Sequence, residues 1–372
     1  MIRLARKIVC WGSCLVLLAL LVGCGGGESS DPAATQAGTT AARKEETTPP
    51  KGETTVPEVF KDRDPLECPT HSSESIGVTL DADANAENIG VMMAEAEGFY
   101  EDVGLRVFTG GPKNPARAVK YVALGIDEIG VAQQPQVLLA AEEKVGAPLL
   151  AIGSVIQQNN AAMIWLPDSG IGDVADLAGK TIGIPGAPFQ EDFLETVLAR
   201  AGLTLDDVTV KRTNYRSAAA LLEERVDALF GVTWNNEGAA LEARGAEPVI
   251  TRARSLGLPL YEELVVIAPA KCVAPHPAVY RDFMKAVARG IEAVRSHPAA
   301  AVRLMKQNYG LDPRFRISDV WAPLKATLPQ LSSDAHMDLG QVGHLAAWMH
   351  QKGILGRKPP IEELFTNDYL AP

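Results

Sequence analysis

Short apolar runs alternate with helical patterns through most of this chain, and this alternation limits its fold more than any other feature. From residue 76 onward, each run of β-branched or apolar residues is followed by a segment with apolar residues at helical spacing. Repeated strand-helix-strand units predict an α/β fold, with mostly parallel sheets flanked by helices. The predicted strands lie at 76–80, 104–110, 129–132, 148–156, 181–185, 208–213 and 228–232.

Two crossings of the chain predict two lobes. The α/β blocks are separated near 167–176, which reads PDSGIGDVAD, and the chain returns to the first block at Val265. We therefore assign 76–166 plus 265–372 to lobe 1 and 167–264 to lobe 2, with a largely helical tail padding the outside of one lobe. Open α/β sheets bind ligands at the carboxyl ends of their strands, so we expect a ligand cleft at the hinge.

The first residues have the pattern of an export signal. Basic residues precede the apolar run CLVLLALLV, which is shorter than the ~20 residues that span a membrane. We interpret 1–23 as a lipoprotein signal peptide and expect lipidation of Cys24 in the sequence LVGC; the alternative is an ordinary signal peptide cut nearby. Residues 24–75 are rich in Gly, Ser, Thr, Pro and charge, which predicts a disordered tether. We expect a domain anchored by lipid on the extracytoplasmic face of a bacterial cell membrane.

Two cysteines remain in the exported domain, Cys68 and Cys272. In an oxidising compartment they either form a disulfide or stay as two unpaired thiols. Neither has a Cys or His partner at metal-site spacing, so we do not expect them to be zinc ligands. We expect no metal and no cofactor in this protein.

Four motifs resemble the solute-binding proteins of ABC importers. They are DLAGK at 176–180, GAPFQ at 186–190, TWNNE at 233–237 and GLPLYEEL at 257–264. The first is common to many such proteins. The last two together are more specific for the branch that binds the aminopyrimidine precursor of thiamine, with a related branch that binds riboflavin. The resemblance extends from residue 76 to the carboxyl end, and it implies a periplasmic binding protein type II fold and an ABC permease with its ATPase as partners.

The glycine-bearing turn GIPGAPF lies between a predicted strand and a predicted helix. Such a turn leaves backbone N–H groups free to hold an anion or a carbonyl oxygen at the helix start, which makes Gly186, Ala187 and Phe189 candidate ligand-binding residues. The alternative is a plain tight turn.

The segment Trp234-Asn235-Asn236-Glu237 directly follows the predicted strand ALFGV. Trp234 could stack on a heteroaromatic ring, and Glu237 could accept hydrogen bonds from an aminopyrimidine edge, with Asn235 beside them. The alternatives are a core tryptophan and a glutamate that caps the next helix.

The chain departs from the pyrimidine-binding pattern where an aromatic or titratable residue is expected. Ala82 takes a tryptophan position, Asn88 and Gln158 take histidine positions, and Gln133 takes a tyrosine position. With Asn85, these amides suit an uncharged polar or heterocyclic ligand better than a strong anion.

A binding protein for a thiamine precursor or related vitamin precursor is the function that the resemblance favours. A binding protein for a sulfonate, nitrate or another small anion is the alternative ligand class. An enzyme is disfavoured, because a fungal relative that makes the pyrimidine uses its own histidine, and that position is Asn88 here. A lipoprotein scaffold with a degenerate cleft is a further alternative. The formal charge of −11 disfavours a nucleic-acid partner, and we expect a monomer.

Overall fold

The computed structural model describes residues 67–111, 114–308 and 317–370. The predicted signal peptide, Cys24 and residues 24–66 of the predicted tether lie outside these ranges. Within them, no helix is both long enough and apolar enough to cross a membrane.

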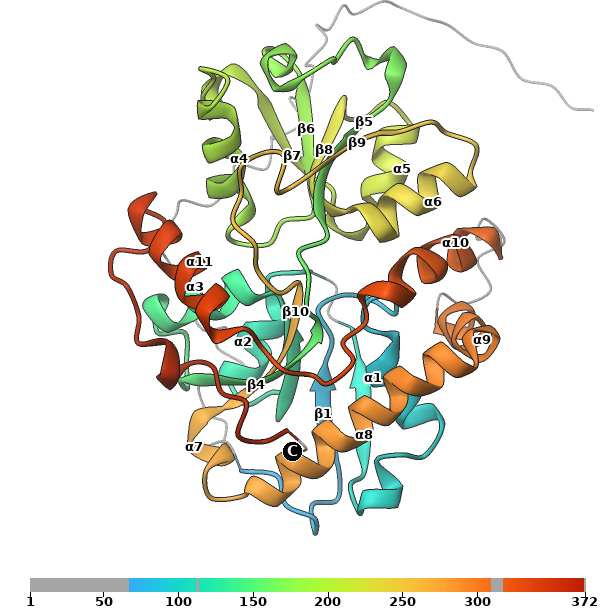
Figure 1. Ribbon diagram of the computed structural model, residues 1–372, viewed down its shortest axis with the longest axis vertical. Coiled ribbons are helices and arrows are strands. Elements are labelled where there is room, and N and C mark those ends of the chain that lie inside the picture. The colour runs from blue at the N-terminus through green and yellow to red at the C-terminus, as the bar shows by residue number, and fades with distance from the viewer. Residues whose placement is uncertain (1–66, 112–113, 309–316, 371–372) are drawn as a thin grey trace, which may run out of the picture. The chain divides into compact units, whose positions relative to one another are not determined.

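The first of two five-stranded sheets has the strand order β2-β1-β3-β10-β4 (Figure 1). Strands β1, β2 and β3 are parallel, and β10 runs antiparallel to both β3 and β4. The sheet is built from β1 (Ile76–Thr79), β2 (Val107–Gly110), β3 (Ile129–Ala132), β4 (Leu149–Ile156) and β10 (Leu264–Pro269).

The second sheet repeats this arrangement with the order β7-β6-β8-β5-β9. Strands β6, β7 and β8 are parallel, and β5 is antiparallel to β8 and β9. Its strands are β5 (Ala161–Trp165), β6 (Thr181–Ile184), β7 (Thr209–Arg212), β8 (Ala228–Thr233) and β9 (Val249–Arg252). The predicted two-sheet α/β architecture is confirmed, and each sheet is mixed, with the parallel pairings on one side of it.

Helices cover both sheets. Those joined to the second sheet are α4 (Gln190–Ala199), α5 (Ser217–Leu222) and α6 (Ala239–Ala243). The others are α1 (Ile89–Ala96), α2 (Arg117–Ala123), α3 (Gln134–Glu143), α7 (Ala270–Val273), α8 (Pro277–Ser296), α9 (Pro298–Asn308), α10 (Ser318–Thr327) and α11 (Leu339–Gln351). Helices α1 and α8 pack together at two glycines: a Cβ atom on Gly290 would overlap the carbonyl oxygen of Gly90, so this close packing requires glycine.

The first crossing between the sheets lies earlier than the sequence suggested. Strand β5 belongs to the second sheet, so the chain crosses between Ile156 and Ala161 and not near Pro167. All five residues of β5 are buried, so the run AAMIW shows no alternation that would set it apart from the strand before it. The return crossing ends at Leu264, where β10 begins, close to the predicted Val265.

The carboxyl-terminal helices pack against helices of both lobes, whereas the sequence predicted that they cover one lobe alone. Helix α8 lies along α1 of the first sheet, whereas α10 packs against α6 of the second (Figure 1). The ring of Trp348 in α11 meets the ring of Phe193 in α4 edge to face, with centroids 5.0 Å apart. The carboxyl-terminal helices therefore bridge the two lobes.

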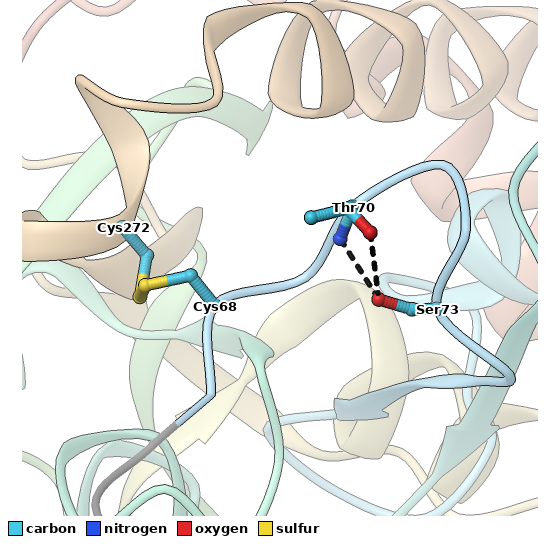
Figure 2. Close-up of a disulfide and its surroundings, with 4 residues drawn as sticks. All are labelled: Cys68, Thr70, Ser73 and Cys272. Carbon is cyan, nitrogen blue, oxygen red and sulfur yellow. Dashed lines mark hydrogen bonds between the residues drawn. A yellow bond between two sulfur atoms is a disulfide. The ribbon is translucent and has the colours of Figure 1, made fainter.

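A disulfide joins Cys68 to Cys272 (Figure 2). Of the two alternatives for these cysteines, a disulfide or two unpaired thiols, the structure has the disulfide. The main-chain N–H of Thr70 donates to Ser73 Oγ at 2.8 Å, and His71 Nε2 lies 2.9 Å from Asp282 Oδ2. The segment 68–75, which the sequence analysis placed in the tether, is thus fastened to α7 and α8, because its cysteine and turn residues find partners far along the chain.

Candidate functional site

A cavity of about 650 Å³ lies between the two sheets, at the carboxyl ends of β1, β3, β6 and β8. This is where open α/β sheets bind ligands. The first lobe contributes Asp81, Ala82, Asp83, Asn85, Glu87, Pro115, Gln133, Gln136 and Glu263. The second lobe and α10 contribute Pro185, Gln190, Arg216, Ala218, Ala219, Glu223, Gly231, Val232, Thr233, Asn236, Glu237, Ala240, Arg244 and Asp319.

Glu87 connects the lobes at the cavity wall. It precedes α1, and only 4% of its surface is exposed. Its Oε1 accepts hydrogen bonds from Asn160 Nδ2 at 2.9 Å and from Asn235 Nδ2 at 3.0 Å, and Asn235 also donates to Thr327 Oγ1 at 2.8 Å. Burial and the nearby negative charge of Glu263 raise the pKa of Glu87 well above its ordinary range.

Glu263 is held directly beside Glu87 by neutral donors. Gln133 Nε2 donates to its Oε1 at 2.6 Å, and the main-chain N–H of Asn160 donates to its Oε2 at 3.0 Å. Burial raises the pKa of Glu263 to about 7. Burial likewise raises the pKa of Asp81 to about 6, although the hydrogen bond from Asn88 opposes the shift.

The second lobe supplies a carboxyl group from the π turn Trp234–Gly238, which directly follows β8. Glu237 Oε2 accepts from the main-chain N–H of Thr233 at 2.9 Å and from its Oγ1 at 3.1 Å. Burial raises the pKa of Glu237 as well. Short π segments are frequent at functional sites, and this one turns Glu237 toward the cavity.

Negative charge dominates the lining. Seven of its side chains carry carboxyl groups and two carry guanidinium groups. One guanidinium, that of Arg244, already pairs with Asp319 at 3.2 Å, and the other, Arg216, is exposed. Among the described residues, the lining contains no histidine, lysine or aromatic side chain, and no group of His, Cys, Asp and Glu that could hold a metal ion.

Three predicted site residues line this cavity: Asn85, Gln133 and Glu237. Asn85 Oδ1 accepts from the main-chain N–H of Glu87 at 2.7 Å, so it also shapes the turn before α1. Asn88 is fully buried, and its amide bonds Asp81 Oδ1 and the Asp83 carbonyl. It orients a cavity carboxyl group and does not line the cavity itself.

The glycine-bearing turn does not offer free N–H groups. The main-chain N–H groups of Gly186 and Ala187 both donate to Gln190 Oε1, at 2.8 and 2.9 Å. In this structure the chain supplies its own acceptor, which agrees with the alternative of a plain tight turn. Phe189 is buried against Phe193 and Tyr261 in the core.

Three further predicted residues lie outside the lining. Trp234 is half-buried, and the guanidinium carbon of Arg252 lies 4.0 Å from its ring centroid. Asn235 is fully buried and bonds Glu87 from behind, and Gln158 is exposed. A strand's end fixes where a residue lies along the sheet but not which way its side chain points, and these three residues do not line this cavity.

A family model described as NMT1/THI5 like matches residues 85–301, more than half of the chain. The chain belongs to the NMT1/THI5-like family. The match includes Glu87, Gln133, Glu237 and Glu263, and so most of the cavity lining.

Named relatives of this NMT1/THI5-like protein include both binding proteins and enzymes. It is 28% identical to a formylaminopyrimidine-binding protein of Halalkalibacterium halodurans over 235 residues, covering 63% of this chain and 71% of the relative. It is 27% identical to a riboflavin-binding protein of Chloroflexus aurantiacus over 293 residues, covering 75% and 81%. It is 26% identical to a 4-amino-5-hydroxymethyl-2-methylpyrimidine phosphate synthase of Candida albicans over 240 residues, covering 62% and 70%.

The fold is that of periplasmic binding proteins. The alkanesulfonate-binding protein of Xanthomonas axonopodis pv. citri superimposes with a TM-score of 0.62 at 17% identity, covering 79% of this chain and 98% of that protein. The family and this fold support a solute-binding role.

Most of the cavity's charged residues were not predicted from the sequence: Asp81, Asp83, Glu87, Arg216, Glu223, Arg244, Glu263 and Asp319. A signal was present for two of them: Glu263 directly precedes the apolar run LVVIA, and Glu87 lies among small and apolar residues before α1. A carboxyl group next to a segment that must be buried is itself a candidate for a buried, functional charge.

Proposed function

We propose that this NMT1/THI5-like protein is the extracytoplasmic solute-binding component of an ABC importer. It would capture a small nitrogen heterocycle that carries N–H donors, by closure of the two lobes. The observation that carries the proposal is the 650 Å³ cavity between the sheets, lined from both lobes by carboxyl and amide groups. A cavity of this size accommodates a small molecule.

The acceptor-rich lining favours a ligand with N–H groups. Carboxylate oxygens accept hydrogen bonds and repel anions. A sulfonate or nitrate ligand would face Asp81, Glu87, Glu237 and Glu263. The relatives named for formylaminopyrimidine and riboflavin support a heterocycle over a small anion.

The synthase relatives define the competing function. The lining described here has no histidine or lysine that could hold or react with a carbonyl-bearing substrate, which favours binding over catalysis. Lipidation of Cys24, the tether and delivery to a permease are part of the same proposal and rest on the sequence at the amino terminus.

A thermal-shift and calorimetric screen of residues 25–372 tests the proposal. The ligands are formylaminopyrimidine, hydroxymethylpyrimidine, riboflavin, taurine and nitrate. A specific ligand at ~100 times its dissociation constant adds about 2.7 kcal/mol of stability, which raises the melting temperature by several degrees. A shift with a heterocycle alone supports the proposal. A shift with taurine or nitrate alone, or turnover of a ligand during the measurement, contradicts it.

A further inference from the structure

We propose that the cavity selects a ligand whose N–H groups carry a formal positive charge, and that Glu87 receives that charge. The inference rests on the proposed function, since it takes this cavity as the solute site, and it adds the charge of the ligand. The ligand class is an ammonium or amidinium cation small enough for 650 Å³.

One oxygen of Glu87 is available to a ligand. Its Oε1 is saturated by the amides of Asn160 and Asn235, whereas within the described residues no donor contacts Oε2. Only 4% of the surface of Glu87 is exposed, and the residue lines the cavity. Because Glu87 lines the cavity, a donor on a bound ligand can reach this second oxygen.

The second lobe presents a similar oxygen. Both hydrogen bonds of Glu237 from Thr233 end on Oε2. Glu237 lines the cavity from the second lobe, whereas Glu87 lines it from the first. A ligand with several N–H groups could therefore be held from both lobes, which couples binding to closure.

Within the described residues, no Lys, Arg or His side chain forms a hydrogen bond with Glu87 or Glu263. In this part of the chain, Glu87 and Glu263 are bonded by neutral N–H groups, from Gln133, Asn160, Ala161 and Asn235. Two neighbouring buried carboxylates are unfavourable together, so the pair holds a proton while the cavity is empty, in line with the raised pKa of Glu87. A cationic ligand can take the place of that proton, whereas a neutral ligand of the same shape cannot.

A charge series on one ring tests the inference by calorimetry. The probes are 4-amino-2-methylpyrimidines that carry at position 5 an aminomethyl group, a hydroxymethyl group or a hydroxymethyl phosphate, which are cationic, neutral and anionic. Putrescine serves as an aliphatic cation. We expect the aminomethyl compound to bind at least tenfold more tightly than the hydroxymethyl compound, and the phosphate to bind too weakly to measure.

Glu87→Gln separates charge from shape. The glutamine Oε1 can still accept from Asn160 and Asn235, so the lobes stay connected while the charge is lost. We expect the aminomethyl compound to lose tenfold or more in affinity and the hydroxymethyl compound clearly less, because the amide nitrogen that replaces Oε2 accepts from neither ligand and only the cation also loses its counter-charge. Glu262→Gln is the matched control: Glu262 is also a buried carboxyl group and precedes Glu263, but it does not line the cavity, so both affinities should be unchanged.

Each outcome decides between the two proposals. Tighter binding of putrescine than of the aminomethyl compound supports a cationic ligand and indicates that this ligand is an aliphatic amine. Equal or tighter binding of the neutral compound, or equal losses for both compounds in Glu87→Gln, overturns the charge inference and leaves a heterocycle-binding protein. If none of the four probes binds, the proposed ligand class itself fails, and the charge inference fails with it.

Discussion

Replacing Glu262 by glutamine should stabilise the protein at pH 8 and leave its stability nearly unchanged at pH 4. Only 1% of Glu262 is exposed, and its Oε1 accepts from the main-chain N–H of Asp338 at 2.7 Å. Its Oε2 is buried without a hydrogen-bond partner among the described residues. Burial raises the pKa of Glu262 from 4.5 to about 7, so the folded state favours the protonated form.

The sign and size of the effect follow from proton linkage. A carboxyl group with a raised pKa contributes stability that is fully present below pH 4.5 and is lost as the pH rises through about 7. A shift from 4.5 to about 7 corresponds to about 3 kcal/mol lost by the wild type at pH 8. Glutamine has no charge to bury, and its Oε1 can keep the bond to Asp338. The amide nitrogen of the glutamine replaces Oε2 of Glu262, which also lacks a hydrogen-bond partner among the described residues. Both proteins therefore bury one unpaired polar atom here, and this atom contributes little to the difference in unfolding free energy.

Urea denaturation at pH 4, 6 and 8 measures the effect. We expect the difference in unfolding free energy between Glu262→Gln and wild type to grow from near zero to about 3 kcal/mol across this range. Glu74 is exposed, so Glu74→Gln is the control and should show no such growth. A difference that does not depend on pH, or a loss of stability at pH 8, would refute the reasoning, because the carboxylate would then be stabilised in the fold.

Two other substitutions test the assignments at the edges of the site. Trp234→Ala should lower the unfolding free energy by about 2 kcal/mol, because the ring packs half-buried against Arg252. Its ligand affinity should be unchanged by calorimetry, and a tenfold loss of affinity would return Trp234 to the binding surface. Replacing both Cys68 and Cys272 by serine opens a loop with a sequence separation of 204 residues, for which chain entropy gives an upper value of about 5 kcal/mol. A denaturation midpoint equal to that of the wild type would show that the bond contributes little.

The fold was largely predictable from the sequence because each strand is a separate apolar run with a helix after it. The exception, β5, is buried on both faces and follows β4 closely, so its membership in the second sheet depends on its pairing with β8 and β9. Pairing between distant strands is decided by the packing of the whole domain and leaves no local pattern.

The candidate site was predictable only where one local rule was sufficient. Gln133 directly follows β3, Glu237 lies in the turn that directly follows β8, and both reach the cavity. Glu87 acquires its role from Asn160 and Asn235, which lie 73 and 148 residues further along the chain. The turn at Gly186 has the expected shape, but Gln190 occupies its N–H groups. These outcomes depend on partners that a local pattern does not identify.

The disulfide between Cys68 and Cys272 also determines how mechanical force enters the domain. Tension applied to the chain at Glu67 reaches the disulfide at Cys68 before it reaches β1, which begins at Ile76. The load passes into α7, which directly follows β10 inside the first sheet. Without this bond, the same pull would act on β1 along its hydrogen bonds to β2 and β3 and could peel the sheet apart. With it, tension applied at the amino-terminal end enters the first sheet through α7 and the inner strand β10 and not through β1.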